Sequence, residues 1–159
     1  KRNIHVDYKP SSNLPLAMIS PSHIQGVWLN ILINAMDAIE ASQEGLIQIS
    51  TKLHQDRIQV IISDNGKGIT PEQLSRIFEP FYTSRRNTGG TGLGVSIAHG
   101  IIEEHGGILG VLSKPGLGTR FSLFLPETEE VKLELEPTIL CVHDEKAFPE
   151  MIRSYFAKA

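Results

Sequence analysis

Two asparagines and two glycine-rich turns are the residues of this chain best suited to chemistry. Asn30 and Asn34 lie four positions apart in a segment with helical apolar spacing, so both amides should share one helix face. An amide oxygen is a suitable neutral ligand for Mg²⁺, which takes its other ligands from water and phosphates. The turns 64–68 and 90–94 follow this segment. Their order predicts a pocket for ATP with Mg²⁺, although the asparagines could instead only bond neighbouring backbone.

The first turn, Asp64-Asn-Gly-Lys-Gly68, follows the apolar run that begins at Ile58. Asp64 should therefore emerge at a strand end, where its carboxylate can accept a hydrogen bond from the adenine amino group. A guanine carbonyl would be repelled there. Gly66 and Gly68 would let bare backbone lie against the ring. The alternative is a self-satisfied turn in which the glycines supply positive φ.

The second turn, Gly90-Thr-Gly-Leu-Gly94, opens a segment with helical spacing. Gly90, Gly92 and Gly94 would let backbone amides crowd around a phosphate chain, and the helix would add its positive end. A tight start to a helix that needs only flexibility is the alternative. The P-loop ending Gly-Lys-Ser/Thr and the third glycine of a dinucleotide fingerprint are both missing, so neither of those nucleotide folds is supported.

Hydropathy patterning predicts the elements that must position these residues. An N-terminal hairpin is expected from strands 4–8 and 16–19, followed by one long amphipathic helix over about 22–41 that Ser20 caps. Paired strands 46–53 and 57–62 come next, the second leading into Asp64. A short helix 71–78, a helix 93–104 and strands 108–113 and 119–125 complete the expected sheet and its helices.

Composition sets the class of protein. The chain has 159 residues, 40% of them hydrophobic, which is enough for one packed core of ordinary size. A formal net charge of −3 gives no global reason to bind nucleic acid or an anionic membrane. No apolar stretch approaches the roughly 20 residues that span a bilayer. A cytoplasmic location is expected, with membrane attachment of the parent protein left open.

Two further segments complete the organisation. Polar residues and glycines over 82–90 have the composition of a mobile lid, and aromatic residues precede them in Phe78-Glu-Pro-Phe81. After Pro126 an acidic linker is expected over 127–137. Residues 138–159 then read as about one βα unit, too short to fold alone.

Four segments together are similar to the N, G1, F and G2 boxes of the catalytic ATP-binding domain of sensor histidine kinases. They are Asn30-Ile-Leu-Ile-Asn34-Ala-Met-Asp-Ala38, Asp64-Asn-Gly-Lys-Gly-Ile69, Phe78-Glu-Pro-Phe81 and Gly90-Thr-Gly-Leu-Gly94. The resemblance covers about residues 1–126. It implies the Bergerat ATP-binding fold shared with DNA gyrase and MutL, an α/β (α+β) two-layer sandwich with helices on one face of a mixed β-sheet.

By this resemblance Asn34 would ligate Mg²⁺ with support from Asn30, Asp64 would read adenine and Thr119 would help hold it. Arg85, in the lid, joins the two asparagines as a candidate catalytic residue. The resemblance implies a wider set of nucleotide contacts: Asn34, Asp64, Gly66, Gly68, Ile69, Phe81, Gly90, Thr91, Gly92, Leu93, Gly94 and Thr119. Thr88 and Arg85 depart from the residues that many members carry, which puts lid geometry in question.

The implied activity is donation of the γ-phosphate of ATP to a histidine on a separate dimerisation domain, in two-component signalling. None of the six histidines has the acceptor context, so the chain is expected not to autophosphorylate alone. Hydrolysing relatives place a glutamate where this chain has Asn30, and asparagine is a poor base, which favours transfer. A hydrolysing ATPase and a nucleotide-sensing module remain alternatives.

The C-terminal segment is similar to the first strand of a response-regulator receiver domain. Thr138-Ile-Leu-Cys-Val-His-Asp-Glu145 carries His143 where the first aspartate usually stands. The resemblance implies a truncated receiver-like unit over 138–159, a hybrid-kinase parent and a receiver as a further partner. A chance strand with an acidic end is the alternative.

Overall fold

The computed structural model describes residues 3–41, 44–83 and 90–128. Residues 84–89 of the predicted lid, which include Arg85 and Thr88, and the segment 129–159 lie outside this description. The acidic linker beyond Thr128 and the receiver-like unit therefore remain predictions.

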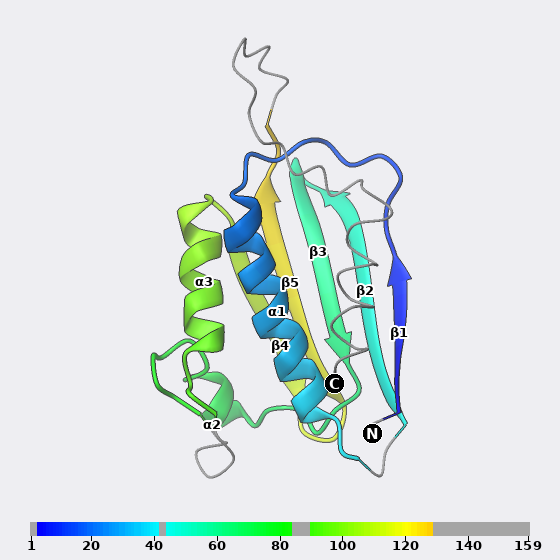
Figure 1. The fold of residues 1–159 in the computed structure, drawn as a ribbon, viewed down its shortest axis with the longest axis vertical. Helices are drawn as coiled ribbons and strands as arrows, with labels where there is room; N and C mark the ends of the chain where they lie inside the picture. Colours follow the sequence, from blue (N-terminus) through cyan, green and yellow to red (C-terminus); the bar gives the residue numbers. More distant parts are fainter. Residues whose placement is uncertain (1–2, 42–43, 84–89, 129–159) are drawn as a thin grey trace.

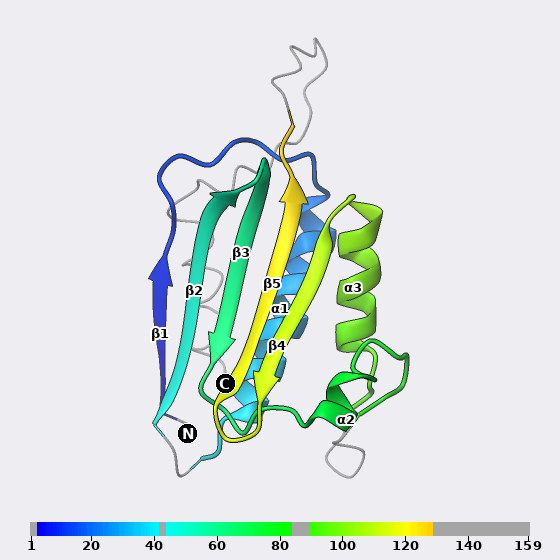
Figure 2. The same ribbon diagram turned by 180° about the vertical axis from the view of Figure 1, so that it is seen from behind.

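A five-stranded mixed sheet forms one layer and the helices form the other (Figure 1). The strands are β1 (Ile4–Lys9), β2 (Gly45–His54), β3 (Arg57–Asp64), β4 (Ile108–Lys114) and β5 (Gly118–Pro126), in the order β1-β2-β3-β5-β4. The helices are α1 (Pro21–Ala38), α2 (Pro71–Leu74) and α3 (Gly94–Glu104). Seen from behind, α1 lies beyond the sheet and α3 stands beside β4, and none of the described helices crosses the face of the sheet turned to the reader (Figure 2).

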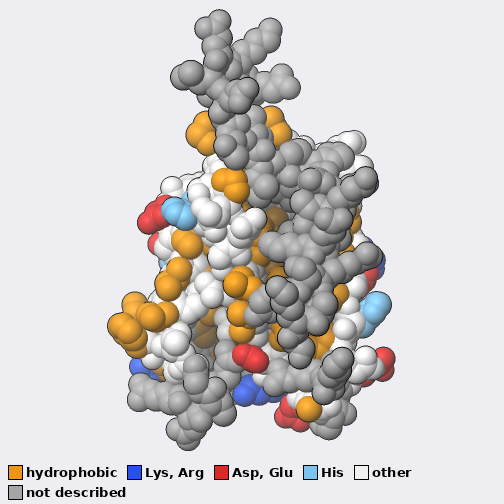
Figure 3. Space-filling view, in the orientation of Figure 1, with side chains coloured by type: hydrophobic (Ala, Val, Ile, Leu, Met, Phe, Trp, Pro, Cys, Tyr) orange, Lys and Arg blue, Asp and Glu red, His pale blue; other side chains and the backbone are white. Residues whose placement is uncertain are grey.

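The core lies between these layers. β2, β3 and β5 alternate buried and more exposed residues, so every second side chain points towards the helices. The largest fully buried side chains come from both layers: Ile24, Val27, Ile31, Ile39, Ile47, Ile49, Ile58, Val60, Ile62, Ile102, Leu123 and Leu125. Hydrophobic side chains also reach the surface along α3 and over the loop that follows α2 (Figure 3).

The predicted N-terminal hairpin is wrong. β1 pairs in parallel with β2, Ile4 opposite Gly45, and residues 16–19 form no strand. Parallel neighbours need a crossover, which residues 10–20 and α1 supply. Ala17 and Ile19 are buried in the core, so packing of the extended crossover explains this apolar run without a ladder partner.

The other elements agree with the predictions except at their ends. α1 stops at Ala38, and Ser20 stands at its N-cap without a side-chain capping bond. α2 ends at Leu74 and turns follow it. α3 ends at His105-Gly106-Gly107 as expected, with Gly106 at a φ of 66°. Among the described helices, none is long and apolar enough to cross a bilayer.

Candidate functional site

A cavity of about 380 Å³ opens at the end of the sheet where β3 ends and β5 begins. Its walls combine α1, the loop after β3, the α2 region, the start of α3 and β5. The lining residues are Asn30, Ile33, Asn34, Asp37, Ala38, Asp64, Lys67, Gly68, Ile69, Gln73, Ile77, Tyr82, Thr83, Gly90, Thr91, Gly92, Gly94, Val95, Thr119 and Phe121. Segments from most of the domain therefore meet in one hollow.

The α1 wall carries both predicted asparagines. Asn30 and Asn34 line the cavity together with Ile33 and Asp37, because residues three and four apart share a helix face. A Cβ on Gly94, the first residue of α3, would lie 3.2 Å from Asn30 Oδ1. The lack of a side chain at Gly94 thus lets the Asn30 amide lie against the start of α3.

Asp64 is the last residue of β3 and is paired with Thr119 of β5. Its Oδ1 accepts hydrogen bonds from the backbone N–H of Gly66 at 2.9 Å and of Thr119 at 3.3 Å. Burial raises the pKa of this carboxyl, and the two N–H donors oppose that shift. Within the described part of the chain no hydrogen bond reaches Oδ2. The site thus offers a hydrogen-bond acceptor in a largely dry corner of the cavity.

The loop after Asp64 and the β4–β5 turn press closely together. Gly68 has a φ of 70°, and a side chain there would collide with the carbonyl of Lys114. Gly66 has no room either, since a Cβ would lie 2.6 Å from the backbone of Ala38. The N–H of Gly116 donates to Lys67 O at 2.8 Å and joins the two turns. Close backbone packing therefore accounts for both glycines of the first turn, whereas the positive φ that the alternative explanation expected of them occurs at Gly68 but not at Gly66.

The second glycine turn leads directly into α3. Gly90, Thr91, Gly92 and Gly94 all line the cavity. Gly92 has a φ of 70°, and a Cβ there would lie 2.5 Å from the carbonyl carbon of Phe81. Free N–H groups in the first turn of a helix, together with its dipole, favour an anion such as phosphate. This end of the cavity is thus suited to a phosphate chain.

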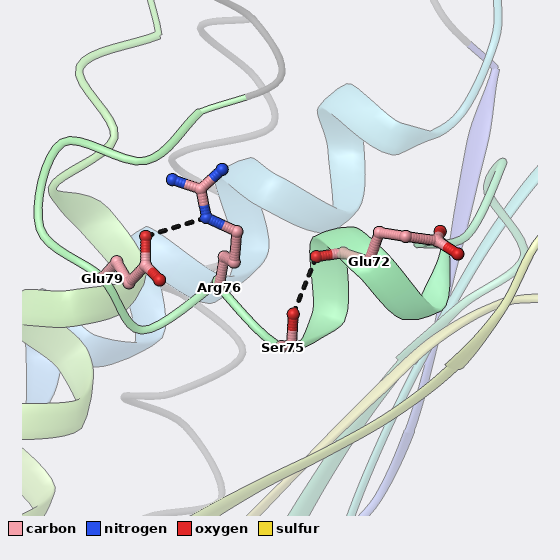
Figure 4. A network of polar contacts seen from close by, with 4 residues as sticks. All are labelled: Glu72, Ser75, Arg76 and Glu79. Atoms are coloured by element: carbon pink, nitrogen blue, oxygen red, sulfur yellow. Dashed lines mark hydrogen bonds and ion pairs between the residues drawn. The ribbon is translucent and has the colours of Figure 1, made fainter.

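The segment after α2 forms the outer wall. A capping box starts α2: Thr70 Oγ1 accepts from Gln73 N–H at 3.3 Å, and Gln73 Oε1 accepts from Thr70 N–H at 3.1 Å. Beyond it, Arg76 Nε donates to Glu79 Oε2 at 2.9 Å (Figure 4), and its guanidinium lies 4.5 Å from the centre of the Tyr82 ring. These contacts hold Gln73 and Tyr82 at the cavity.

Ser75 adds a local contact to the same segment. Its Oγ donates to Glu72 O at 2.9 Å, which closes the turn that follows α2 (Figure 4). Because Arg76, Glu79 and Ser75 are all solvent-accessible, these bonds shape the segment more than they stabilise the domain.

Of the predicted site residues that the structure describes, all but three line this cavity. Gly66, Phe81 and Leu93 do not line the cavity, and Phe81 is 68% exposed with a φ of 65°. Their contact with a nucleotide, like any role of Arg85, stays a prediction.

Several lining residues carried no site prediction, among them Asp37, Lys67, Gln73, Tyr82 and Phe121. Helical spacing from Asn34 could have indicated Asp37. The position of Phe121, two residues beyond Thr119 on the same face of β5, could have been found in the same way. Gln73 and Tyr82 depend on how the segment after α2 folds back, which local sequence does not encode.

No group of three or more His, Cys, Asp or Glu residues able to hold a metal ion occurs within the described ranges. A magnesium ion here would therefore depend on the amide of Asn34 and on phosphate oxygens and water. The oxygen atoms that α1 offers to the cavity suit such a magnesium ion, since Asp37 lies one helical turn from Asn34.

Comparison with known proteins decides the family. The sequence pattern of "Histidine kinase-, DNA gyrase B-, and HSP90-like ATPase" matches residues 19–129. The chain belongs to this family. Sensor histidine kinase ZraS of Escherichia coli O157:H7 is 37% identical over 125 residues, which are 79% of this chain and 26% of that protein. The chain thus spans about a quarter of the length of the curated relative.

Solved structures agree with this family. The nucleotide-free catalytic domain of histidine kinase ThkA is 31% identical, with a TM-score of 0.68 over 79% of this chain and 80% of that one. Full-length ShkA in complex with AMPPNP is 29% identical, with a TM-score of 0.68 over 82% of this chain and 27% of that one. The described fold is accordingly the Bergerat-type fold of a histidine-kinase catalytic ATP-binding domain.

Proposed function

We propose that this domain binds ATP with Mg²⁺ and donates the γ-phosphate to a histidine on a separate dimerisation domain, in two-component signalling. One observation carries the proposal. The buried acceptor Asp64, the two asparagines of α1 and the glycine turn at the start of α3 all line one cavity. Its ends have the chemistry that an amino-bearing base and a phosphate chain need.

Asn34 is the proposed Mg²⁺ ligand and Asn30 its support, with Asp64 and Thr119 at the base and Gly90 to Gly94 at the phosphates. Catalysis would rest on positioning and on neutralising phosphate charge. A receiver domain is the proposed next acceptor, because the relatives found are sensor kinases.

Hydrolysis of ATP is the rival activity, and it would need a general base among the residues that line the cavity. Asn30 is a neutral amide and no general base. Asp37 and Asp64 are the carboxylates that line the cavity. Asp64 lies at the base end, where its carboxylate accepts hydrogen bonds from the backbone N–H groups of Gly66 and Thr119. Transfer to an external histidine is therefore the better-supported activity, and Asp37 is the residue to test for hydrolysis.

The test mixes the chain with ATP-Mg²⁺ and the cognate dimerisation domain and measures acid-labile phosphohistidine. Transfer by the wild-type chain that is lost in Asn34→Ala supports the proposal. Asn13→Ala, at an exposed position of the crossover, is the matched control and should transfer normally. Tight ATP binding without transfer would favour the sensing module. Sustained phosphate release by the chain alone, lost in Asp37→Asn, would favour the ATPase.

A further inference from the structure

Ser113 of β4 stands behind the base end of the cavity without lining it. Its hydroxyl has three hydrogen-bond partners. Ile69 N–H donates to Ser113 Oγ at 2.9 Å, Gly118 O accepts from it at 2.9 Å, and Thr119 Oγ1 lies 2.9 Å away. Ser113 therefore connects the loop after Asp64 with the first residues of β5.

Counting protons fixes the direction of each bond. A serine hydroxyl has one proton and two lone pairs. The carbonyl of Gly118 can only accept, so it takes the proton of Ser113. The N–H of Ile69 can only donate, so it occupies one lone pair. Thr119 must then donate its own hydroxyl proton to the second lone pair.

Thr119 consequently presents only an acceptor to the cavity. The residue is 5% exposed, and its one hydroxyl proton points away towards Ser113. Asp64, its partner across the strands, likewise presents the acceptor Oδ2 because Oδ1 already binds two N–H groups. The base end of the cavity thus carries two neighbouring acceptors.

We propose that Ser113 is a positioning residue that sets base specificity, by holding the Thr119 hydroxyl in the acceptor orientation. This inference rests on the proposed function, since it requires a nucleotide in the cavity. The 6-amino group of adenine supplies donors to this end, whereas a carbonyl at position 6 of the purine brings a third acceptor. Without Ser113, the hydroxyl of Thr119 can rotate and donate to that carbonyl.

The experiment compares the affinities of the full chain for ATP and for inosine triphosphate, which has a carbonyl at position 6, by calorimetry with Mg²⁺. Wild type should prefer ATP. Ser113→Ala should lower the ratio of the two affinities about tenfold, the value of one hydrogen bond. Ser122→Ala is the matched control, because Ser122 alternates with the buried Phe121 and Leu123 and so faces the other side of β5.

A double-mutant cycle separates positioning from general loosening of the loop. In a Thr119→Val background no hydroxyl remains to rotate, so adding Ser113→Ala should leave the ratio of affinities unchanged. The same tenfold fall in that background would overturn the proposal. If wild type binds neither nucleotide, the proposed function itself fails, which is a different outcome.

A second measurement needs no variant. In the wild-type chain, NMR should find a slowly exchanging Thr119 hydroxyl proton close to the β-protons of Ser113. A Thr119 hydroxyl that exchanges at the solvent rate would contradict the proposed bond, even if Ser113→Ala failed to fold.

Discussion

The backbone N–H of Ser20 donates to Nε2 of His105 at 2.9 Å, which joins the start of α1 to the end of α3. The other ring nitrogen, Nδ1, lies 2.7 Å from the carbonyl oxygen of Ile101. Because Nε2 accepts, Nδ1 must carry the proton and donate to that carbonyl. The ring of His23 packs edge-on against His105, with ring centres 6.0 Å apart. The imidazole of His105 thus links the two helices at the end far from the cavity.

We expect His105→Ala to destabilise the domain by about 1 to 3 kcal/mol, because the Ser20 N–H and the Ile101 carbonyl each lose a partner. Urea unfolding followed by circular dichroism measures the change. His105→Gln, whose amide oxygen can still accept, should cost less. The exposed His5→Ala is the control, and an equal loss there would contradict the role of the link.

Two glycines of the β4–β5 turn should respond differently to the same substitution. Both have positive φ, 77° at Gly116 and 89° at Gly118, so alanine costs about 1 to 2 kcal/mol at either. A Cβ at Gly118 would also collide with the carbonyl of Asp64, whereas Gly116 has open space. Gly118→Ala should therefore be roughly 2 kcal/mol worse and should weaken ATP binding. Equal melting temperatures would contradict this packing.

Hydrophobic periodicity was enough to predict α1, α3 and all five strands near their observed positions. The parallel pairing of β1 was not predictable in this way, because strand candidates near each other in sequence suggest a hairpin. Ala17 and Ile19 are apolar because they are the crossover residues that pack into the core, and burial alone does not separate a strand from an extended loop. Only the whole sheet determines which partner β1 takes.

The raised pKa of Asp64 predicts a pH-dependent stability difference between wild type and Asp64→Asn. A carboxyl whose pKa is raised by folding contributes stability below its unfolded pKa, near 3.8, and loses that contribution as pH rises through the folded pKa. Without nucleotide, the stability of wild type relative to Asp64→Asn should therefore fall as pH rises above about 4, and the difference should become constant once the folded carboxyl is ionised. Urea midpoints at each pH measure it, and a difference that does not change at any pH would contradict the effect of burial.

The same substitution should change base preference. In Asp64→Asn the amide oxygen can still accept from the N–H groups of Gly66 and Thr119, which turns the NH₂ group towards the cavity. Two donors then face each other when adenine binds, so ATP affinity should fall at least about tenfold and that of inosine triphosphate should rise. Calorimetry tests this. Asp56→Asn, in the exposed β2–β3 hairpin, is the control.

The sequence was more informative about the site than about its supports. The shared position of Asn30 and Asn34 could be predicted because helical spacing alone places the two side chains on one face of α1. Ser113 was missed because its role depends on Ile69, 44 residues away, and on a strand register that brings it opposite Thr119. A hydroxyl in an ordinary strand gives no local signal of such contacts.

The cavity is lined by residues as far apart in the sequence as Asn30 and Phe121, so it exists only while α1 and the sheet are packed together. A nucleotide bound there has affinity for the folded chain alone. At a free concentration one hundred times its dissociation constant it would add about 2.7 kcal/mol to the free energy of unfolding. The free energy of unfolding of this domain therefore depends on the nucleotide concentration. Without nucleotide the whole domain would unfold more readily, including the parts that never touch the ligand.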